Sequence, residues 1–170
     1  MAFELRILTA DDHDAYNAFF AHGAARYPAH FRIDPADFRD RPFPTEPSGV
    51  GYTLVAHDGA RWLGVATLER EQGRVKRRHI AWVLRMLVIE PNAGVGRALL
   101  RELKRIARSM PGVEKLNLTV AVDNAAAVHL YASEGFVPFA QERDAFRAGD
   151  TRVDELTMSL SLVDFAPTVL

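Results

Sequence analysis

Two glycines and an arginine occupy the place where a helix is expected to begin after an apolar strand. The segment is "VIEPNAGVGRALLRELK", residues 88–104, and it contains Gly94, Gly96 and Arg97. The first backbone N–H groups of a helix lack intrahelical partners, and the helix dipole adds a positive field beside them. Because glycine has no Cβ, a bulky anion can approach the main chain closely at such a turn. The segment therefore suits a phosphate or diphosphate ligand, although a tight turn that binds nothing would have the same composition.

The glycine pattern differs from two common phosphate-binding loops. It lacks the third glycine of GxGxxG, where Leu99 stands, and it lacks the GK[ST] of a Walker loop. The expected helix carries one acid, Glu102, and a row of cations: Arg97, Arg101, Lys104, Arg105 and Arg108. Such a row is usually a solvated face, and we interpret most of it in this way. Arg97 is the exception, because a cation in the first turn of a helix is unfavourable unless an anion offsets its charge.

Composition argues against several classes of protein. The chain has 170 residues, the length of one domain, and we expect a single domain over residues 1–170. The formal net charge of −1 gives no indication of nucleic-acid or membrane-surface binding. The absence of cysteine excludes disulfides, thiolate metal sites and a cysteine nucleophile, and no other spacing indicates a metal site. With no signal-peptide pattern and no apolar run long enough to span a bilayer, we expect a cytoplasmic protein.

Apolar periodicity predicts the elements of the first third of the chain. A strand over residues 3–7 precedes a helix that is expected to turn Tyr16, Phe19 and Phe20 inward. Residues 28–49 contain five prolines, which predicts a long loop with one helical turn after Pro35. A loop of that length in a compact domain is usually functional or mobile.

The rest of the chain is predicted to alternate strands and helices. A hairpin over residues 51–71 turns at Asp58-Gly59, the dipeptide that a type I′ turn prefers. The elements expected after it are a strand at 80–89, a helix at 95–108, a strand at 113–122, a helix capped by Asp123 or Asn124 and stopped by Gly135, and two final strands. A strand–helix–strand crossover requires parallel strands. We therefore predict an α/β fold with a mixed, mostly antiparallel sheet.

The helix after residue 123 completes a second motif. Its residues of interest are Asn124, Ala127, Leu130, Tyr131, Gly135 and Phe136. Together with the glycine turn, this pattern resembles the acetyl-CoA-binding core of the GCN5-related N-acetyltransferases (GNAT), which follow a glycine loop with N-x-x-A and L-Y-x-x-x-G-F. The resemblance covers the chain in element order and residues 80–139 in detail. It implies acetyl-CoA as co-substrate, a β-α-β core that binds it, and helices on both faces of the central sheet.

The glycine turn departs from the family pattern V-x-P-x-x-[RQ]-G-x-G-x-G/A. From Val88 to Gly96 it is two residues shorter, and the Arg or Gln with its adjacent glycine is missing. The position of that side chain falls on Pro91, which has no N–H to donate. By resemblance, the pyrophosphate would be held by the remaining amides, those of Gly94, Val95, Gly96 and Arg97. We favour the interpretation that acetyl-CoA binds more weakly than in the family and that Arg97 partly restores its binding. The alternative is that the cofactor site has been lost.

The resemblance also implies roles for residues near the thioester. Met86 and Val88 lie on the strand whose amides would meet the pantetheine arm and the thioester oxygen. Asn124 would hydrogen-bond the same arm, although it would also serve as a plain helix cap. Tyr131 would protonate the departing thiolate, because phenols and thiols ionise in a similar range. From periodicity alone, Tyr131 would instead be a core side chain, since it shares a helix face with Val128.

No motif indicates the general base that must accept a proton from the amine. The strand over residues 80–89 contains no acid, so the available candidates are Glu69, Glu71 and His79, each of which would also fit the surface. His129 is expected to be an exposed helix residue rather than a catalytic one.

The acceptor is expected to be a primary amine of a small molecule or peptide, and the resemblance implies that residues 16–49 and 140–155 shape its pocket. The aromatic residues Phe31, Phe38 and Phe43 could line that pocket, and Asp154 or Glu155 could attract a cationic amine. The leading hypothesis is therefore an acetyl-CoA-dependent N-acetyltransferase that uses direct attack. The alternatives are a non-catalytic acyl-CoA-binding or sensing module and a purely structural domain. Homodimers are frequent in the family, but no residue pattern here indicates one.

Overall fold

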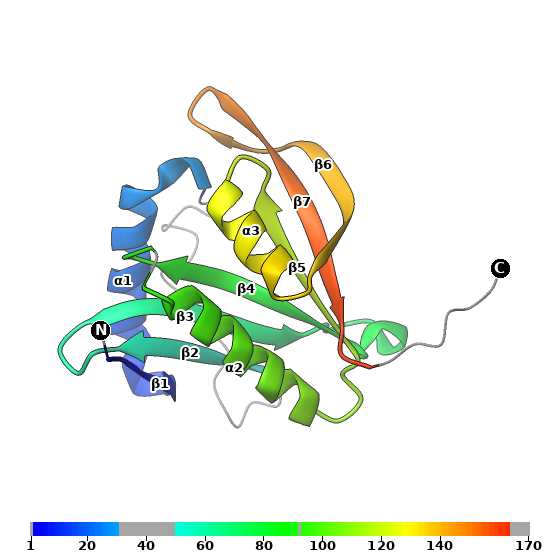
Figure 1. Ribbon diagram of the computed structural model, residues 1–170, viewed down its shortest axis with the longest axis horizontal. Coiled ribbons are helices and arrows are strands. Elements are labelled where there is room, and N and C mark those ends of the chain that lie inside the picture. Colours follow the sequence, from blue (N-terminus) through cyan, green and yellow to red (C-terminus); the bar gives the residue numbers. More distant parts are fainter. Residues whose placement is uncertain (1, 31–49, 92, 164–170) are drawn as a thin grey trace.

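The computed structural model describes residues 2–30, 50–91 and 93–163, and within them one seven-stranded sheet in the order β1-β2-β3-β4-β5-β7-β6 (Figure 1). The strands are β1 Glu4–Ile7, β2 Gly51–His57, β3 Trp62–Arg70, β4 Ile80–Val88, β5 Lys115–Ala121, β6 Val137–Ala148 and β7 Thr151–Ser161. The α-helices are α1 His13–Arg26, α2 Val95–Ser109 and α3 Ala125–Ser133. Short 3₁₀ turns are η1 Ala10–Asp12, η2 Pro28–His30 and η4 Val75–Arg77. The predicted element order and the α/β class are confirmed.

The central strands β4 and β5 diverge soon after they meet. They pair in parallel from Ile80 with Lys115 to Trp82 with Asn117, whereas every other described strand pair is antiparallel. The ladder between β3 and β4 is irregular opposite Ala66, where Arg85 has a φ of 51°, a conformation that non-glycine residues seldom adopt. Beyond Trp82, β4 therefore leaves β5 and opens a gap in the middle of the sheet.

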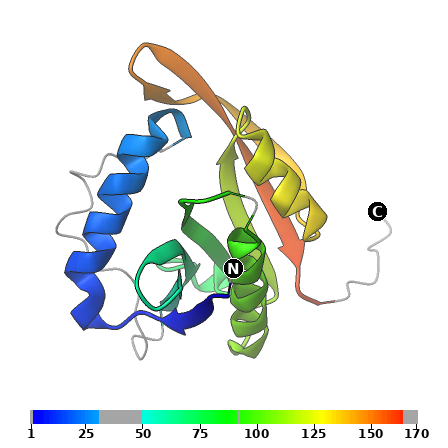
Figure 2. The ribbon, with the colours of Figure 1, turned by 60° about the vertical axis from the view of Figure 1, so that its left-hand side comes forward.

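Helices cover both faces of the sheet, as the resemblance implied. In Figures 1 and 2, α1 lies on one side of β2–β4, and α2 and α3 lie on the other. The α2 stripe of Leu99, Leu103 and Ile106 is buried in the larger core, because apolar residues at helical spacing share one face. On the other side, Tyr16 and Phe20 of α1 pack in a second core beneath β2–β4.

The hairpin between β2 and β3 corrects the predicted turn type. Four residues separate the strands, and only Gly59 among them has positive φ (92°), whereas a type I′ turn needs two such residues. The Asp58 carboxylate instead accepts hydrogen bonds from the backbone N–H groups of Ala60 and Arg61, at 3.2 and 2.9 Å. The side chain of Asp58 thus organises a wider turn than the Asp-Gly dipeptide suggested.

Two helix boundaries were predicted correctly in physical detail. Asn124 Oδ1 accepts a hydrogen bond from the Ala127 N–H at 3.2 Å, which caps α3. Gly135 has a φ of 94° and ends the same helix, as expected of a glycine in the left-handed region. The helical turn expected after Pro35, and Phe31, Phe38 and Phe43 with it, lie outside the described residues.

Candidate active site

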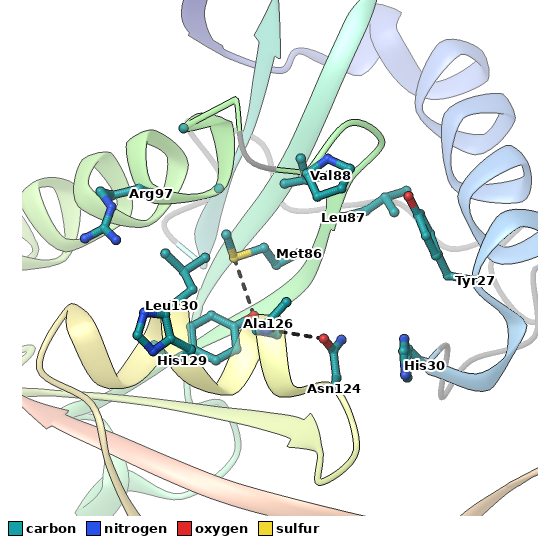
Figure 3. Close-up of a pocket in the computed structure, with 15 residues that line it drawn as sticks. Tyr27, His30, Met86, Leu87, Val88, Arg97, Asn124, Ala126, His129 and Leu130 are labelled. Carbon is teal, nitrogen blue, oxygen red and sulfur yellow. Dashed lines mark hydrogen bonds between the residues drawn. The ribbon is translucent and has the colours of Figure 1, made fainter.

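A pocket of about 590 Å³ opens where β4 diverges from β5. Its walls come from the end of β4, from the glycine turn and first turn of α2, from α3 and the residue before it, and from the segment that follows α1 (Figure 3). The lining residues are Tyr27, His30, Met86, Leu87, Val88, Pro91, Gly94, Gly96, Arg97, Asn124, Ala126, Ala127, His129, Leu130 and Tyr131. The fold thus brings together seven of the predicted site residues, from two motifs about 30 positions apart.

The glycine turn presents unpaired amides to this pocket. Gly94 precedes α2 with a φ of 78°, a left-handed conformation that glycine adopts without strain, and as the N-cap residue it has no side chain with which to cap the helix. The first hydrogen bond of the helix runs from Ala98 N–H to the Gly94 carbonyl, at 3.0 Å. The N–H groups of Val95, Gly96 and Arg97 therefore have no intrahelical acceptor. The Val95 side chain itself is buried in the core and does not line the pocket.

Gly96 faces the pocket at a point where no larger residue would fit easily. A Cβ at this position would lie 3.1 Å from Leu130 Cδ2 and 3.3 Å from Met86 Cε. These distances are shorter than ordinary contacts between carbon atoms. Glycine here keeps the helix start close to both β4 and α3 while leaving the pocket open beside them.

Tyr131 reaches from α3 toward β4 across the pocket. Its hydroxyl donates a hydrogen bond to Met86 Sδ at 3.5 Å, and its ring packs at 6.1 Å from the ring of Phe136. The residue is 7% exposed, and burial raises the pKa of Tyr131 to about 12. The side chain is therefore both a core residue, as its periodicity indicated, and a proton-bearing group at the pocket wall.

Arg97 on the basic face of α2 pairs with an acid that the sequence analysis did not consider. Its Nη1 donates a hydrogen bond at 2.7 Å to Oε1 of Glu134, a carboxylate with only 4% of its side chain exposed. Arg101 and Lys104 pair with the same carboxylate, at 3.0 and 2.7 Å. Burial alone would raise the pKa of Glu134, but the three hydrogen-bonding cations offset it and lower the pKa to about 2. Three of the five cations thus share one buried carboxylate in an ion cluster, while the side chains of Arg97 and Arg101 stay 41% and 63% exposed on the helix face.

The ion cluster depends on a residue that the sequence motifs did not single out. Glu134 is the last residue before Gly135, and its carbonyl also accepts a hydrogen bond from Lys104 at 3.1 Å. The excess of cations over acids in α2 was the available signal, because it requires an anion from elsewhere in the fold. The cluster ties the end of α3 to the length of α2, and therefore holds two walls of the pocket together.

The candidate bases from the sequence lie away from the pocket. Glu69 pairs with Trp82 in the β3–β4 ladder, and Glu71 accepts a hydrogen bond from Trp82 Nε1 at 2.7 Å. His79 is exposed just before β4 begins. Trp82 precedes Met86 by four positions, or roughly 13 Å of extended strand. The structure therefore does not bring Glu69 to the pocket, and its catalytic role stays a prediction.

The end of α1 contributes pocket residues that no motif indicated. Tyr27 follows α1, and its hydroxyl donates a hydrogen bond to the Ile89 carbonyl at 3.0 Å. His30, on η2, lines the pocket and lies with Nε2 at 3.7 Å from Asp123 Oδ1. Residues 16–49 were expected to shape the acceptor pocket, but nothing in the sequence distinguished these two side chains from their neighbours.

Comparison with known proteins agrees with this geometry. The sequence profile described as the acetyltransferase (GNAT) family matches residues 13–136, which is most of the chain. The protein belongs to this family. The predicted family and fold class are therefore confirmed, while a search of curated proteins gives no significant match.

Solved structures of similar fold include several acetyltransferases. An N-acetyltransferase from Staphylococcus aureus Mu50 has a TM-score of 0.82 at 18% identity, covering 96% of this chain and 100% of that chain. The protein yncA from Salmonella typhimurium, described as a putative acetyltransferase and solved with its cofactor acetyl-CoA, has a TM-score of 0.79 at 22% identity, covering 98% of both chains. A GNAT-family acetyltransferase from Streptococcus pneumoniae has a TM-score of 0.78 at 23% identity, covering 94% and 99%. Acetyl-CoA, the co-substrate expected from the resemblance, is thus the molecule bound in one of these relatives.

Two features are absent from the part of the chain that the structure describes. No helix among the described residues is long and apolar enough to cross a membrane. Within the same ranges, no group of three or more potential ligand side chains is placed to hold a metal ion.

Proposed function

We propose that the protein is an N-acetyltransferase that transfers the acetyl group of acetyl-CoA to a primary amine of a small molecule or peptide. The observation that carries the proposal is the shared pocket. It joins unpaired amides at the start of α2, the diverging main chain of β4, the Asn124 cap and the Tyr131 hydroxyl. Family membership supports the reaction class. That the acceptor is a primary amine and that the protein is cytoplasmic remain predictions from the sequence.

The residues present fit a diphosphate ligand at the glycine turn. The N–H groups of Val95, Gly96 and Arg97 have no intrahelical acceptor, and the positive end of the α2 dipole lies among them. Gly94 leaves open space above the turn, since a Cβ there would meet no atom within 4 Å. Pro91 supplies no N–H, so this shortened turn offers fewer donors than the family pattern. We expect correspondingly modest affinity.

The chemistry that acetyl-CoA supplies when bound is an activated acetyl thioester. Around it, this chain would hold and orient the reactants: Asn124 beside the pantetheine arm, and the main chain of Met86 and Val88 beside the acyl group. Tyr131 would donate its phenolic proton to the departing sulfur. Because the pKa of Tyr131 is raised to about 12 by burial, the hydroxyl stays protonated throughout the physiological range.

The experiment that tests this proposal has two stages. Acetyl-CoA is first titrated into the protein by calorimetry and by thermal shift, with adenosine as a control that lacks the diphosphate. Thiol release is then followed with a panel of small amines and peptide N-termini. Binding of acetyl-CoA together with amine-dependent thiol release is the expected result. Binding without release on any amine would favour the sensing module, and no binding at all would leave only a structural domain.

A further inference from the structure

Acetyl transfer also requires a group that takes a proton from the attacking amine. Neither the glycine turn nor Asn124 nor Tyr131 supplies such a group. We infer that His30, oriented by Asp123, is the general base of the acetyl transfer. The inference rests on the proposed function, since a base is needed only if an amine is acetylated. It adds a catalytic residue that neither the motifs nor the family pattern quoted above contains.

The first argument is the chemistry of the pocket wall. Among the described residues that line the pocket, none is Asp or Glu, and the titratable side chains are Tyr27, His30, Arg97, His129 and Tyr131. Arginine does not give up its proton in proteins, and tyrosine ionises near pH 10 or above. Imidazole accepts a proton near pH 6.5, within the range that a general base requires. His30 and His129 are therefore the two candidates within the described wall.

The second argument is position along the pocket. In Figure 3, Arg97 and His129 lie toward the start of α2, whereas Tyr27 and His30 lie toward the end of α1, beyond Asn124. The unpaired amides that suit the diphosphate are at the Arg97 end. An amine acceptor must approach the acetyl group from the side opposite the diphosphate. His30 is therefore at the acceptor end, and His129 is not.

The third argument is that His30 has an orienting partner. Its Nε2 lies 3.7 Å from Asp123 Oδ1, and the two side chains are 34% and 61% exposed. A catalytic base is commonly oriented by a third group, and the 3.7 Å between the two atoms is an ion-pair distance that must shorten before a hydrogen bond forms. The backbone of this turn is also anchored, because His30 N–H donates to the Tyr27 carbonyl at 3.1 Å and Tyr27 Oη donates to the Ile89 carbonyl.

The charged groups around His30 are few among the described residues. Asp123 faces it from the turn before α3, and Arg26 and Tyr27 precede it on its own segment. Strand β6 also packs against η2, and its charged residues near the bulge are Glu142, Arg143 and Asp144. Asp144 is itself paired with Arg147 and Arg152. Asp123 is therefore the carboxylate placed to orient the imidazole.

In the proposed reaction His30 and Tyr131 each take part in a separate proton transfer. His30 accepts a proton from the substrate ammonium and passes it to solvent. The freed amine nitrogen then bonds to the acetyl carbon while the carbon–sulfur bond breaks, and Tyr131 gives its proton to sulfur. The second proton lost from the nitrogen restores Tyr131. One amide, one thiol and one released proton are formed for each ammonium and thioester consumed.

The test compares matched histidine variants in a thiol-release assay with whichever amine the wild-type protein acetylates. His30→Gln should lower kcat about 100-fold or more, with the KM for acetyl-CoA changed less than about threefold. His22→Gln, on the exposed face of α1, should behave as wild type. The acidic limb of the wild-type kcat/KM profile should be absent in His30→Gln, because glutamine cannot take up a proton. Added imidazole should restore part of the rate of His30→Ala, and Asp123→Asn should lower kcat about tenfold.

A second readout does not depend on turnover. The imidazole NMR signals of His30, assigned by their loss in His30→Ala, should shift when the amine is added to the protein with coenzyme A. Wild-type kcat and an unchanged acidic limb in His30→Gln would overturn the inference while leaving the acetyltransferase intact. A rate loss in His129→Gln instead would overturn it in favour of that residue. If the wild-type protein binds no acetyl-CoA and acetylates no amine, the proposed function and the inference fail together.

Discussion

Arg97 in the first turn of α2 and Glu134 at the end of α3 form an ion pair of 2.7 Å between Nη1 and Oε1. The guanidinium that the sequence assigned to a diphosphate is therefore already paired in this structure. An anion at the glycine turn would share Arg97 with Glu134 rather than neutralise an isolated cation. This relationship explains how a cation is tolerated near a helix N-terminus, where the dipole disfavours it.

We expect Glu134→Gln to destabilise the protein substantially. The change removes the one carboxylate that Arg97, Arg101 and Lys104 share, and Lys104 is only 14% exposed. Breaking a buried ion pair by removing one partner typically costs about 3 kcal/mol or more. Urea unfolding at pH 7 should therefore show a free energy of unfolding lower by about 2–4 kcal/mol. The matched control is Glu102→Gln, which breaks the exposed pair with Arg105 and should cost less than about 1 kcal/mol. Equal effects from the two variants would contradict the structural importance of the cluster.

The same carboxylate predicts a dependence of stability on acidity. Folding lowers the pKa of Glu134 from its usual value of 4.5 to about 2. The ionised Glu134 carboxylate thus stabilises the folded state fully above pH 4.5, and this contribution is lost as the pH falls from 4.5 toward 2. The reason is that the Glu134 carboxylate becomes protonated at a higher pH in the unfolded chain than in the folded protein. The difference in unfolding free energy between wild type and Glu134→Gln should be constant from pH 6 to 8 and should shrink below pH 4.5. A difference that stayed constant down to pH 3 would contradict the lowered pKa.

Much of the fold could be predicted because its signals are local. The capping of α3 by Asn124 and its end at Gly135 depend on residues within one helical turn. The stripe of apolar residues on α2 is equally local. The Asp58 turn was predicted wrongly because its geometry depends on the register of two strands and on the side chain as a hydrogen-bond acceptor.

Site residues could be predicted from the sequence only where they belong to a recognisable motif. Tyr131, Asn124 and the glycines belong to a recurring pattern, and the fold places them around one pocket. Glu134, Tyr27 and His30 reach the same region through packing between distant segments, which no local spacing encodes. Glu69 was proposed because it ends the strand before β4, and the antiparallel register places it beside Trp82 instead of Met86.

Gly96→Ala should weaken acetyl-CoA binding while leaving the fold intact. The added Cβ would meet Leu130 Cδ2 at 3.1 Å and Met86 Cε at 3.3 Å, and both are tips of flexible side chains that can move aside. Their movement narrows the pocket, so we expect roughly tenfold weaker affinity by calorimetry and little change in melting temperature. Gly94→Ala is the contrasting variant, since its Cβ meets nothing but its φ of 78° is strained for alanine. In Gly94→Ala the free energy of unfolding should fall by about 1 kcal/mol, and the pocket should not be narrowed. Unchanged affinity in Gly96→Ala would place acetyl-CoA elsewhere.

Tyr131→Phe should separate binding from chemistry. The phenyl ring keeps the packing against Phe136 but removes the hydroxyl that donates to Met86 Sδ. Loss of a general acid commonly lowers rates about 100- to 10,000-fold, so kcat should fall in that range while the Kd for acetyl-CoA changes less than about threefold. Tyr52→Phe, a half-buried tyrosine of β2 that does not line the pocket, is the control and should retain full activity. Because the pKa of Tyr131 is about 12, ionisation of its hydroxyl should cause no loss of wild-type rate up to about pH 10. A Tyr131→Phe variant with wild-type kcat would remove the tyrosine from the reaction and leave water as the proton donor to sulfur.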